Sequence, residues 1–210
     1  MNNHEPMDFP NLPADLAASL LDTDPAALSR LRDSLVGAAA AAGMLDIAYR
    51  TIETPVGTLL LAATEAGLVR VAYDREDHDA VLVALAGKVS PRILLAPGRL
   101  DRPARQLSEY FSGARTVFDL PLDFRLATGF RRSVLAHLTG IGYGTTESYT
   151  DVAAATGRPR AVRAVGTACA TNPLPVVVPC HRVVRSDGTA GGYVGGPAAK
   201  RTLLELESAR

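Results

Sequence analysis

The hydrophobic positions of residues 46–124 follow two different periods, which predicts a mixed α/β layer. Short apolar runs with alternating polarity are separated by Pro-Val-Gly and Glu-Ala-Gly, which are typical turn sequences. Longer stretches carry apolar residues at helical spacing. The pattern predicts strands over 47–54, 58–64, 67–74, 92–96 and 116–124, and helices over 76–89 and 101–113. The first strands are expected to form an antiparallel meander.

From Thr128 onward, helical spacing dominates the apolar pattern. Thr128 is a candidate N-cap, Ser148 with an acid three residues later forms a candidate capping box, and Pro159 suits a first helical turn. Helices are expected over 128–141, 148–157, 158–172 and 197–210, an extended segment over 175–184, and a glycine-rich loop over 186–196. The second and third of these helices are joined by a glycine-containing turn, which predicts a helix-turn-helix.

The first 45 residues have helical propensity but offer no candidate chemistry. A break is expected at Asp24-Pro25, with stops at Gly37 and Gly43. The chain is therefore predicted to have three parts, which are a helical extension of unknown role (1–45), a small α/β domain (46–124) and a mainly helical domain with the helix-turn-helix (125–210).

The composition is that of an ordinary globular protein, and only the distribution of charge along the chain gives information about a binding partner. The 210 residues are 47% hydrophobic and 21% charged, with a net charge of zero. Residues 125–210 carry 11 basic and 5 acidic side chains, whereas residues 1–45 carry 2 and 6. A basic C-terminal part attracts a polyanion, while the overall balance opposes indiscriminate tight binding to nucleic acid. A plain solubility gradient is the alternative.

The apolar runs and the cysteines indicate the compartment and the cofactors. No run reaches membrane-spanning length and the first ten residues lack the features of a signal peptide, so we expect a cytoplasmic protein with no membrane partner. Cys169 and Cys180 are the only cysteines and form no CxxC pair, which argues against disulfides and against a cysteine-built zinc site. We therefore expect no metal and no cofactor.

On a helical wheel, residues 158–172 present a cationic face and a packing face. The cationic face holds Arg160, Arg163, Ala164, Thr167 and Thr171, and the packing face holds Val162, Val165 and Cys169. The small residues beside the arginines let the backbone approach a partner closely. A solvated surface is the commoner role of such a face, but the positive charge of this part of the chain favours a nucleic-acid contact.

The stretch Pro-Cys-His-Arg at 179–182 places a cysteine beside a histidine. A thiol attacks as its thiolate, and an unperturbed cysteine with a pKa of about 8.5 is mostly protonated at neutral pH, so it needs a base. Neighbouring side chains of an extended segment point to opposite faces, which suggests contact through a bridging water. Cys180 is therefore either a nucleophile with His181 as its base or a buried structural thiol.

A catalytic base needs an orienting group, and the last predicted helix offers one. Lys200, Leu203, Leu204 and Glu207 share a face of that helix. If the leucines face the core, Glu207 is drawn inward and needs a polar partner, for which His181 is a candidate. A solvated carboxylate at the helix end is the alternative, and helix geometry alone favours it.

The stretch Pro-Cys-His-Arg-Val is preceded by Asn-Pro and followed by Gly-Gly-Tyr-x-Gly-Gly, a highly specific combination. With it, residues 144–196 closely resemble the active domain of the O6-alkylguanine-DNA alkyltransferases, the methylated-DNA–protein-cysteine methyltransferases. The resemblance runs from about Tyr49 to Glu207, is strong after Thr128, and leaves the first 45 residues uncovered. It implies a ribonuclease-H-like fold for the α/β domain.

The resemblance also implies the activity, which is single-turnover DNA repair by transfer of an alkyl group from O6-alkylguanine to Cys180. O4-alkylthymine is a further candidate substrate. His181 would deprotonate Cys180 through a water, and Glu207 would orient His181, which reverses the solvated alternative for this carboxylate. Tyr149 would hydrogen-bond the guanine and help to neutralise its leaving anion.

The same resemblance implies how DNA is held. The carbonyl of Val183, together with Tyr193 and Val194, would line the pocket for a flipped guanine. Asn172 would brace the turn after the DNA-binding helix, and Arg163 would enter the duplex from the minor groove and replace the extruded nucleotide. The implied partner is double-stranded DNA containing O6-alkylguanine, bound by a monomer.

Three features depart from the family pattern. Val194 stands where many relatives have a small or hydroxyl residue, and a valine side chain directed inward would narrow the pocket against large alkyl groups. Cys169 stands where a larger apolar residue often sandwiches the base. The zinc of some relatives' first domain is not expected, because residues 1–124 contain no cysteine.

Three other functions fit part of the pattern. A catalytically silent sensor of DNA damage keeps the pocket and the arginine but lacks the cysteine, so Cys180 disfavours it. The transcription-activating repair protein has a cysteine-rich zinc domain at its N-terminus, which a cysteine-free extension excludes. A thiol hydrolase that uses Cys180 and His181 stays open, and multiple turnover on a simple ester would support it.

Overall fold

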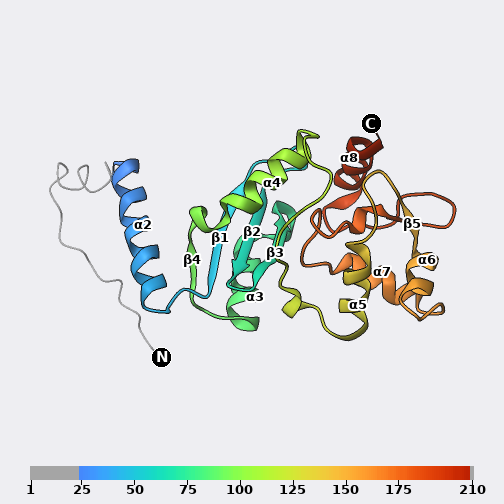
Figure 1. Ribbon diagram of the computed structural model, residues 1–210, viewed down its shortest axis with the longest axis horizontal. Coiled ribbons are helices and arrows are strands. Elements are labelled where there is room, and N and C mark those ends of the chain that lie inside the picture. The colour runs from blue at the N-terminus through green and yellow to red at the C-terminus, as the bar shows by residue number, and fades with distance from the viewer. Residues whose placement is uncertain (1–23, 209–210) are drawn as a thin grey trace, which may run out of the picture.

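The structure, a computed structural model, describes residues 24–208 and shows a sheet-containing half followed by a helical half (Figure 1). The sheet has four strands in the order β3-β2-β1-β4. β1 (Ile47–Ile52), β2 (Leu59–Thr64) and β3 (Gly67–Tyr73) form an antiparallel meander, and β4 (Ile93–Leu95) pairs with β1 in parallel. The predicted antiparallel start is therefore confirmed.

Both faces of this sheet are covered, which explains why the core positions of β2 are apolar without alternation. α3 (His78–Lys88) packs Val81 and Leu85 against one face. α4 (Asp101–Phe111) packs Tyr110 into the cluster on the other face, and that cluster continues into the helical half. One side of the sheet therefore shares its core with the helical half.

The strand predicted over 116–124 does not form. An isolated bridge between Leu68 and Leu122 is the contact that joins this segment to β3. Pro121 has no N–H to donate to a ladder, although its carbonyl accepts the Leu68 N–H at 2.9 Å. The segment then ends in a short 3-10 helix, Phe124–Leu126.

The helical half is built mainly from helices that pack on one another and on the sheet. It contains α5 (Gly129–Leu138), α6 (Tyr149–Ala155), α7 (Val162–Ala170), α8 (Gly196–Ser208) and a short parallel pair of strands, β5 (Glu147–Ser148) and β6 (Val183–Val184). α5, α6 and α7 contact each other pairwise. The capping box predicted for α6 is confirmed, because Ser148 Oγ accepts the Asp151 N–H at 3.1 Å and Asp151 Oδ2 accepts the Ser148 N–H at 2.9 Å.

Two details of the predicted helix starts need correction. Thr128 precedes α5 as predicted, but its side chain makes no capping hydrogen bond. Pro159 was expected in the first turn of α7, which is wrong, because α7 starts three residues later. A separate turn comes first, closed by a hydrogen bond from the Ala161 N–H to the Arg158 carbonyl at 2.8 Å.

The segment predicted as extended over 175–184 forms turns and a short 3-10 helix, Cys180–Arg182, before it reaches β6. The side chain of Asn172 holds this turn, since its Oδ1 accepts the Leu174 N–H at 2.9 Å. Val176 even adopts a left-handed backbone, with φ of 72°. Tertiary contacts therefore override the strand propensity of the valines.

α2 (Pro25–Ala41) is the described part of the N-terminal extension and stands beside the sheet, next to β4 (Figure 1). It begins at the predicted break, with Asp24 capping its first turn. It continues through Gly37, so the stop predicted there is wrong; one glycine costs a helix only about 1 kcal/mol, and alanines surround it. The chain leaves the helix before Gly43, whose φ is 64°. The rest of the extension, 1–23, lies outside the described residues.

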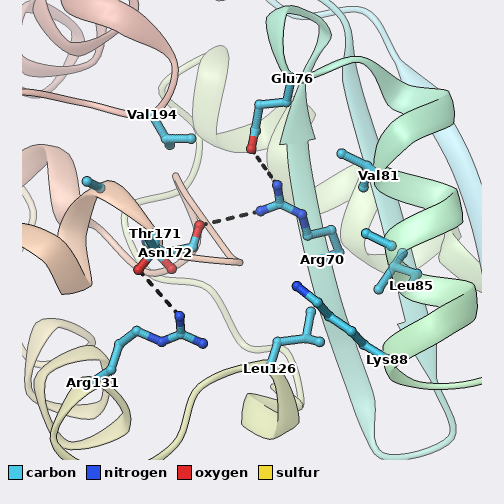
Figure 2. A pocket seen from close by; sticks show the side chains of 12 residues that line it. Arg70, Glu76, Val81, Leu85, Lys88, Leu126, Arg131, Thr171, Asn172 and Val194 are labelled. Atoms are coloured by element: carbon cyan, nitrogen blue, oxygen red, sulfur yellow. Dashed lines mark hydrogen bonds and ion pairs between the residues drawn. The ribbon is translucent and has the colours of Figure 1, made fainter.

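A cavity of about 380 Å³ opens where the two halves meet, between α3 and the C-terminal end of α7 (Figure 2). Three of its lining side chains are cationic, namely Arg70 of β3, Lys88 of α3 and Arg131 of α5. Thr171, directly after α7, lines it from the helical half.

Candidate active site

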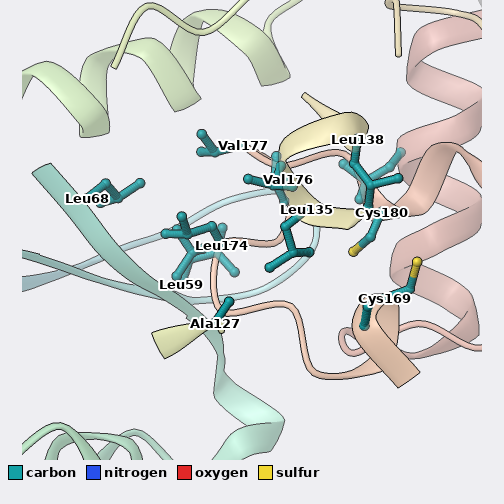
Figure 3. Packing of buried hydrophobic residues seen from close by; sticks show 14 of the residues in the cluster. Leu59, Leu68, Ala127, Leu135, Leu138, Cys169, Leu174, Val176, Val177 and Cys180 are labelled. Carbon is teal, nitrogen blue, oxygen red and sulfur yellow. The ribbon is translucent and has the colours of Figure 1, made fainter. Parts of the chain in front are cut away.

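Cys180 opens the short 3-10 helix after α7 and lies in the core cluster that joins the two halves (Figure 3). It is 1% exposed, and its Sγ accepts a hydrogen bond from Asn172 Nδ2 at 3.1 Å. Burial raises the pKa of the Cys180 thiol to about 11, although the Asn172 hydrogen bond and the charge of Lys200 lower it. At neutral pH the side chain is therefore a thiol that needs a base before it can attack.

Asn172, predicted to brace the turn after the third helix, is fully buried there. Besides its contact with Leu174, its Nδ2 donates to the Val178 carbonyl at 2.9 Å and to Cys180 Sγ. A single side chain thus connects the end of α7 to the reacting sulfur. The segment that it braces is a turn rather than the predicted strand.

Glu207 lies on the inner face of α8 and is 3% exposed, so it is not a solvated carboxylate at a helix end. Its carboxylate accepts five hydrogen bonds. The donors are Tyr110 Oη (2.7 Å), His181 Nε2 (2.9 Å), Arg182 Nε (2.9 Å), Arg182 Nη2 (2.8 Å) and the Gly144 N–H (3.2 Å). Burial raises the pKa of the carboxyl, but these bonds outweigh it and hold the pKa well below its usual range. The site therefore contains a carboxylate that stays ionised.

His181 is completely buried and is fixed by its contact with Glu207. Burial lowers the pKa of the imidazole more than the neighbouring carboxylate raises it, so the ring is neutral at pH 7. A neutral ring that donates from Nε2 carries its lone pair on Nδ1. Nδ1 is buried and has no hydrogen-bond partner among residues 24–208. The histidine thus has the protonation state and the fixed orientation of a general base.

Lys200 is a functional candidate that the sequence interpretation did not identify. It is fully buried on the same face of α8 as Glu207, and its Nζ donates to the Val183 carbonyl at 2.6 Å. Its positive charge lowers the pKa of the Cys180 thiol. The spacing of residues 200 and 207 on one helix face was the available signal, because a buried ammonium needs a partner. The Val183 carbonyl, predicted to line the base pocket, therefore already accepts one donor.

Tyr110 and Arg182 are two further donors that the sequence interpretation did not include. Arg182 directly follows His181, and its guanidinium lies over the ring of Tyr143, 5.8 Å from the ring centre. Tyr110 belongs to the sheet-containing half, 97 residues before its partner Glu207. No local pattern indicates a contact over such a separation.

Tyr149 is the first residue of α6 and is half-buried. Burial raises the pKa of its phenol, so the hydroxyl stays a hydrogen-bond donor at neutral pH. Gly191 packs so closely on this ring that a Cβ at position 191 would overlap it. The glycine-rich loop after β6 therefore lies against Tyr149.

The same loop is held against the sheet-containing half. The hydroxyl groups of Tyr193 and Tyr73 are 3.0 Å apart, and their rings meet edge to face. Tyr193 also packs edge-on against His181, with ring centres 6.2 Å apart. A Cβ at Gly195 would come within 2.5 Å of the Tyr73 ring, and Val194 is partly buried against the core. The structure therefore brings the predicted pocket residue Tyr193 beside the histidine, whereas Val194 lines the cavity between the two halves.

Arg163 is the predicted site residue that the structure keeps apart from this cluster. It lies on the exposed face of α7 together with Thr167, while Val165 and Cys169 are buried on the opposite face. Within α7 the two faces drawn from the helical wheel are therefore confirmed, but Arg160, predicted on the cationic face, lies in the turn before the helix. Arg163 is placed to meet a partner in solution rather than the thiol.

Two absences hold for the described residues, 24–208. In this part of the chain no helix is both long and apolar enough to cross a membrane. In the same part, no group of three His, Cys, Asp or Glu side chains lies together as metal ligands would. Cys169 and Cys180 are both free thiols.

Comparison with protein families gives two adjoining matches. Residues 47–124 match the ribonuclease-like domain of 6-O-methylguanine DNA methyltransferase, and residues 129–209 match the DNA-binding domain of the same family. A methylated-DNA–protein-cysteine methyltransferase of Mycobacterium tuberculosis is 39% identical over 164 residues, which are 78% of this chain and 94% of the relative. The constitutive enzyme of that name from Bacillus subtilis is 39% identical over 163 residues, 76% of this chain and 94% of the relative.

Solved structures agree with these matches. A crystal structure of the Mycobacterium tuberculosis O6-methylguanine methyltransferase has a TM-score of 0.69 at 38% identity and covers 78% of this chain and 94% of its own. A structure of Mycobacterium tuberculosis OGT in complex with DNA has a TM-score of 0.67 at 38% identity, covering 77% of this chain and 93% of its own. The resemblance inferred from the sequence is thereby confirmed, and the chain belongs to the 6-O-methylguanine DNA methyltransferase family, with a ribonuclease-like domain followed by a DNA-binding domain.

Proposed function

We propose that this protein repairs DNA by transferring an alkyl group from the O6 atom of a damaged guanine to its own Cys180, once per molecule. One observation carries the proposal, namely a buried thiol followed by a neutral histidine whose Nε2 is fixed on an ionised Glu207 and whose Nδ1 is left to accept a proton. The relatives from Mycobacterium tuberculosis and Bacillus subtilis are named for the same transfer.

The reaction begins with the thiol proton. With a pKa of about 11, Cys180 is almost entirely protonated at pH 7 in the resting protein. His181 Nδ1 takes the proton through a water molecule, and general-base help of this kind contributes about 10²–10⁴-fold in rate. Glu207 stabilises the imidazolium that forms, as the orienting carboxylate does in other nucleophile–histidine pairs.

The sulfur then attacks the alkyl carbon. The new S–C bond forms as the C–O6 bond breaks, and the electron pair of that bond stays on the guanine. The Tyr149 hydroxyl donates towards the purine and neutralises part of the developing charge, while the Val183 carbonyl, Tyr193 and Val194 line the base pocket. A thioether offers neither His181 nor water a good leaving group, so each molecule acts once.

DNA reaches this site through α6 and α7, which form a helix-turn-helix. The exposed face of α7 enters the minor groove, and Arg163 fills the gap left by the flipped nucleotide. The excess of basic side chains in residues 125–210 supports a polyanionic partner. The solved complex of a 38% identical relative with DNA supports the same partner. Asn172 couples the two functions, because it links the end of α7 to Cys180.

The remaining features of the proposal concern organisation. The protein acts as a cytoplasmic monomer with three parts, 1–45, 46–124 and 125–210. Light scattering behind a size-exclusion column tests the oligomeric state, and a mass of two chains would contradict it. Expression of residues 46–210 tests whether the extension is dispensable for the transfer reaction.

The test of the transfer itself uses duplex DNA that carries O6-methylguanine. After incubation, mass spectrometry should find one methyl group on the Cys180 peptide, with a yield that stops at one equivalent. Cys169→Ser is the matched control and should be methylated like the parent, whereas Cys180→Ser should bind DNA without being methylated. Methylation of Cys169, or steady turnover beyond one equivalent, would contradict the proposal. Binding without methylation would indicate a silent sensor, and turnover on a simple ester a thiol hydrolase.

A further inference from the structure

The cavity between the two halves, named here the interdomain groove, is lined by an excess of positive charge (Figure 2). Its charged lining residues are Arg70, Lys88 and Arg131 against a single carboxylate, Glu76. Arg70 forms an ion pair with Glu76, and its other guanidinium nitrogen lies 3.5 Å from the Asn172 carbonyl oxygen. The charge of Arg70 is therefore neutralised within the protein.

The other two cations have no neutralising partner among residues 24–208. Within this part of the chain the Arg131 guanidinium bonds only to the Thr171 hydroxyl, at 3.5 Å, which is a neutral group. Lys88 is exposed at the end of α3, and its side-chain ammonium forms no hydrogen bond or ion pair with any other residue in 24–208. In Figure 2 both side chains extend towards the same space as Arg70. The groove thus has a net charge of about two positive units, which suits a phosphate.

The groove adjoins the end of α7 and the loop beside His181, which are the two parts of the proposed DNA-binding surface. Thr171, which lines it, is exposed and directly follows α7, whose exposed face carries Arg163. Val194, from the loop beside His181, lines it as well. Thr171 follows Arg163 by eight positions, which at the helical rise of about 1.5 Å per residue is about 12 Å. Nucleotides of one strand rise by about 3.4 Å each along the duplex axis, so this distance corresponds to at most about three to four nucleotides.

We propose that the interdomain groove binds a backbone phosphodiester of the damaged DNA, within about four nucleotides of the flipped guanine, with Lys88 and Arg131 as its ligands. The ribonuclease-like domain then contributes directly to DNA binding through Lys88. This inference rests on the proposed function, because the strand must run along α7 to reach the groove.

The experiment measures the affinity for an O6-methylguanine duplex as a function of salt, in a Cys180→Ser background so that no transfer occurs. Each phosphate contact adds about 0.9 to the slope of log K against log salt. Lys88→Ala should therefore lower the slope by about 0.9. The ratio of the parent's DNA affinity to that of the variant should then shrink about 3.5-fold between 50 and 200 mM salt. Arg105→Ala is the matched control, since it removes an exposed charge from α4 of the same domain and should leave the slope unchanged.

A shorter duplex gives a second readout. Trimming the flank beside the groove to one base pair should abolish the difference between Lys88→Ala and the parent, and trimming the other flank should preserve it. Equal slopes for Lys88→Ala and Arg105→Ala would overturn the proposal. The proposal would also be overturned if Lys88→Ala lost binding of inorganic phosphate while its slope of log K for DNA against log salt stayed unchanged. That result would indicate a site for free phosphate. Methylation of Cys180 in the parent, measured separately, shows whether the proposed function itself stands.

Discussion

The hydrogen bond from Tyr110 to Glu207 joins the ribonuclease-like domain to the reacting centre, and Tyr110→Phe removes it alone. The ring stays, so its packing against Phe111, Phe118 and Tyr143 is retained. Glu207 keeps four of its five donors and stays ionised at neutral pH. The substitution thus tests a single interaction between the domains.

The magnitude follows from the geometry and the charge. The bond is 2.7 Å long, it is buried, and its acceptor is a carboxylate. Hydrogen bonds to charged groups contribute about 1.5–3 kcal/mol, so the free energy of unfolding should fall by about that amount at pH 7. For a protein of this size, each kcal/mol corresponds to about 2–4 °C in melting temperature.

The pH dependence has a definite sign. Because the pKa of Glu207 is lowered by folding, its ionised form stabilises the fold above the ordinary pKa of 4.5, and that stabilisation is lost as the pH falls through the lower, folded-state value. The unfolded states of Tyr110→Phe and the parent titrate alike, so the difference in unfolding free energy between the two proteins should stay constant from pH 8 through pH 4.5. It should shrink only as the pH falls through the folded-state pKa values of Glu207, which lie well below 4.5. Tyr110→Phe should also raise the folded-state pKa of Glu207.

The assay is urea unfolding of both proteins at pH 7 and at pH 3.5. Tyr143→Phe is the matched control, because its hydroxyl donates to the neutral Leu206 carbonyl at 3.1 Å. Its effect should be about 0.5–1.5 kcal/mol and the same at both pH values. A loss under 0.5 kcal/mol for Tyr110→Phe at pH 7, or a loss that has disappeared at pH 3.5, would refute the reasoning.

Three further outcomes are expected. Glu207→Gln should leave the Arg182 guanidinium buried without its carboxylate, so thermal melting should report a loss of about 3–5 kcal/mol in unfolding free energy. The same variant should slow single-turnover transfer. A pH–rate profile like that of the parent would show that Glu207 does not act through His181. Arg163→Ala should slow repair of duplex O6-methylguanine about tenfold for each ~1.4 kcal/mol of transition-state stabilisation lost. The reaction with free O6-benzylguanine should not slow. An equal effect on both substrates would assign Arg163 to the fold. EDTA should leave the transfer rate unchanged, and a loss that zinc restores would be contrary evidence.

The family resemblance carried most of what the sequence predicted about the site, and helical periodicity placed two of its residues on helix faces. Helical spacing put Glu207 on one face with two leucines, but helix geometry alone favoured a solvated carboxylate, and the resemblance reversed this. The same periodicity separated Arg163 from Cys169. Both face assignments depend only on neighbours within two turns, which the sequence contains. The partners of Glu207 do not obey that rule, because Tyr110 approaches it from another domain.

Predictions from local propensity were wrong where a distant or polar contact determines the backbone conformation. The valines around residue 176 favour a strand, yet the amide of Asn172 satisfies the backbone of a turn instead. The expected strand over 116–124 loses its ladder at Pro121, and α2 passes through Gly37 because its alanines favour helix on both sides. Each failure has a cause within the structure that period and propensity do not encode.

Gly195 lies so close to Tyr73 that the substitutions tolerated at position 195 depend on the residue at position 73, in the other domain. Gly195→Ala alone directs a methyl group into the Tyr73 ring, whereas the same change combined with a small residue at position 73 has room. A scan of single substitutions would therefore record position 195 as intolerant, although a second site sets that constraint. Lineages that exchange the tyrosine can reshape the loop above the thiol, so the range of alkyl groups accepted can diverge through changes in the domain that does not perform the chemistry.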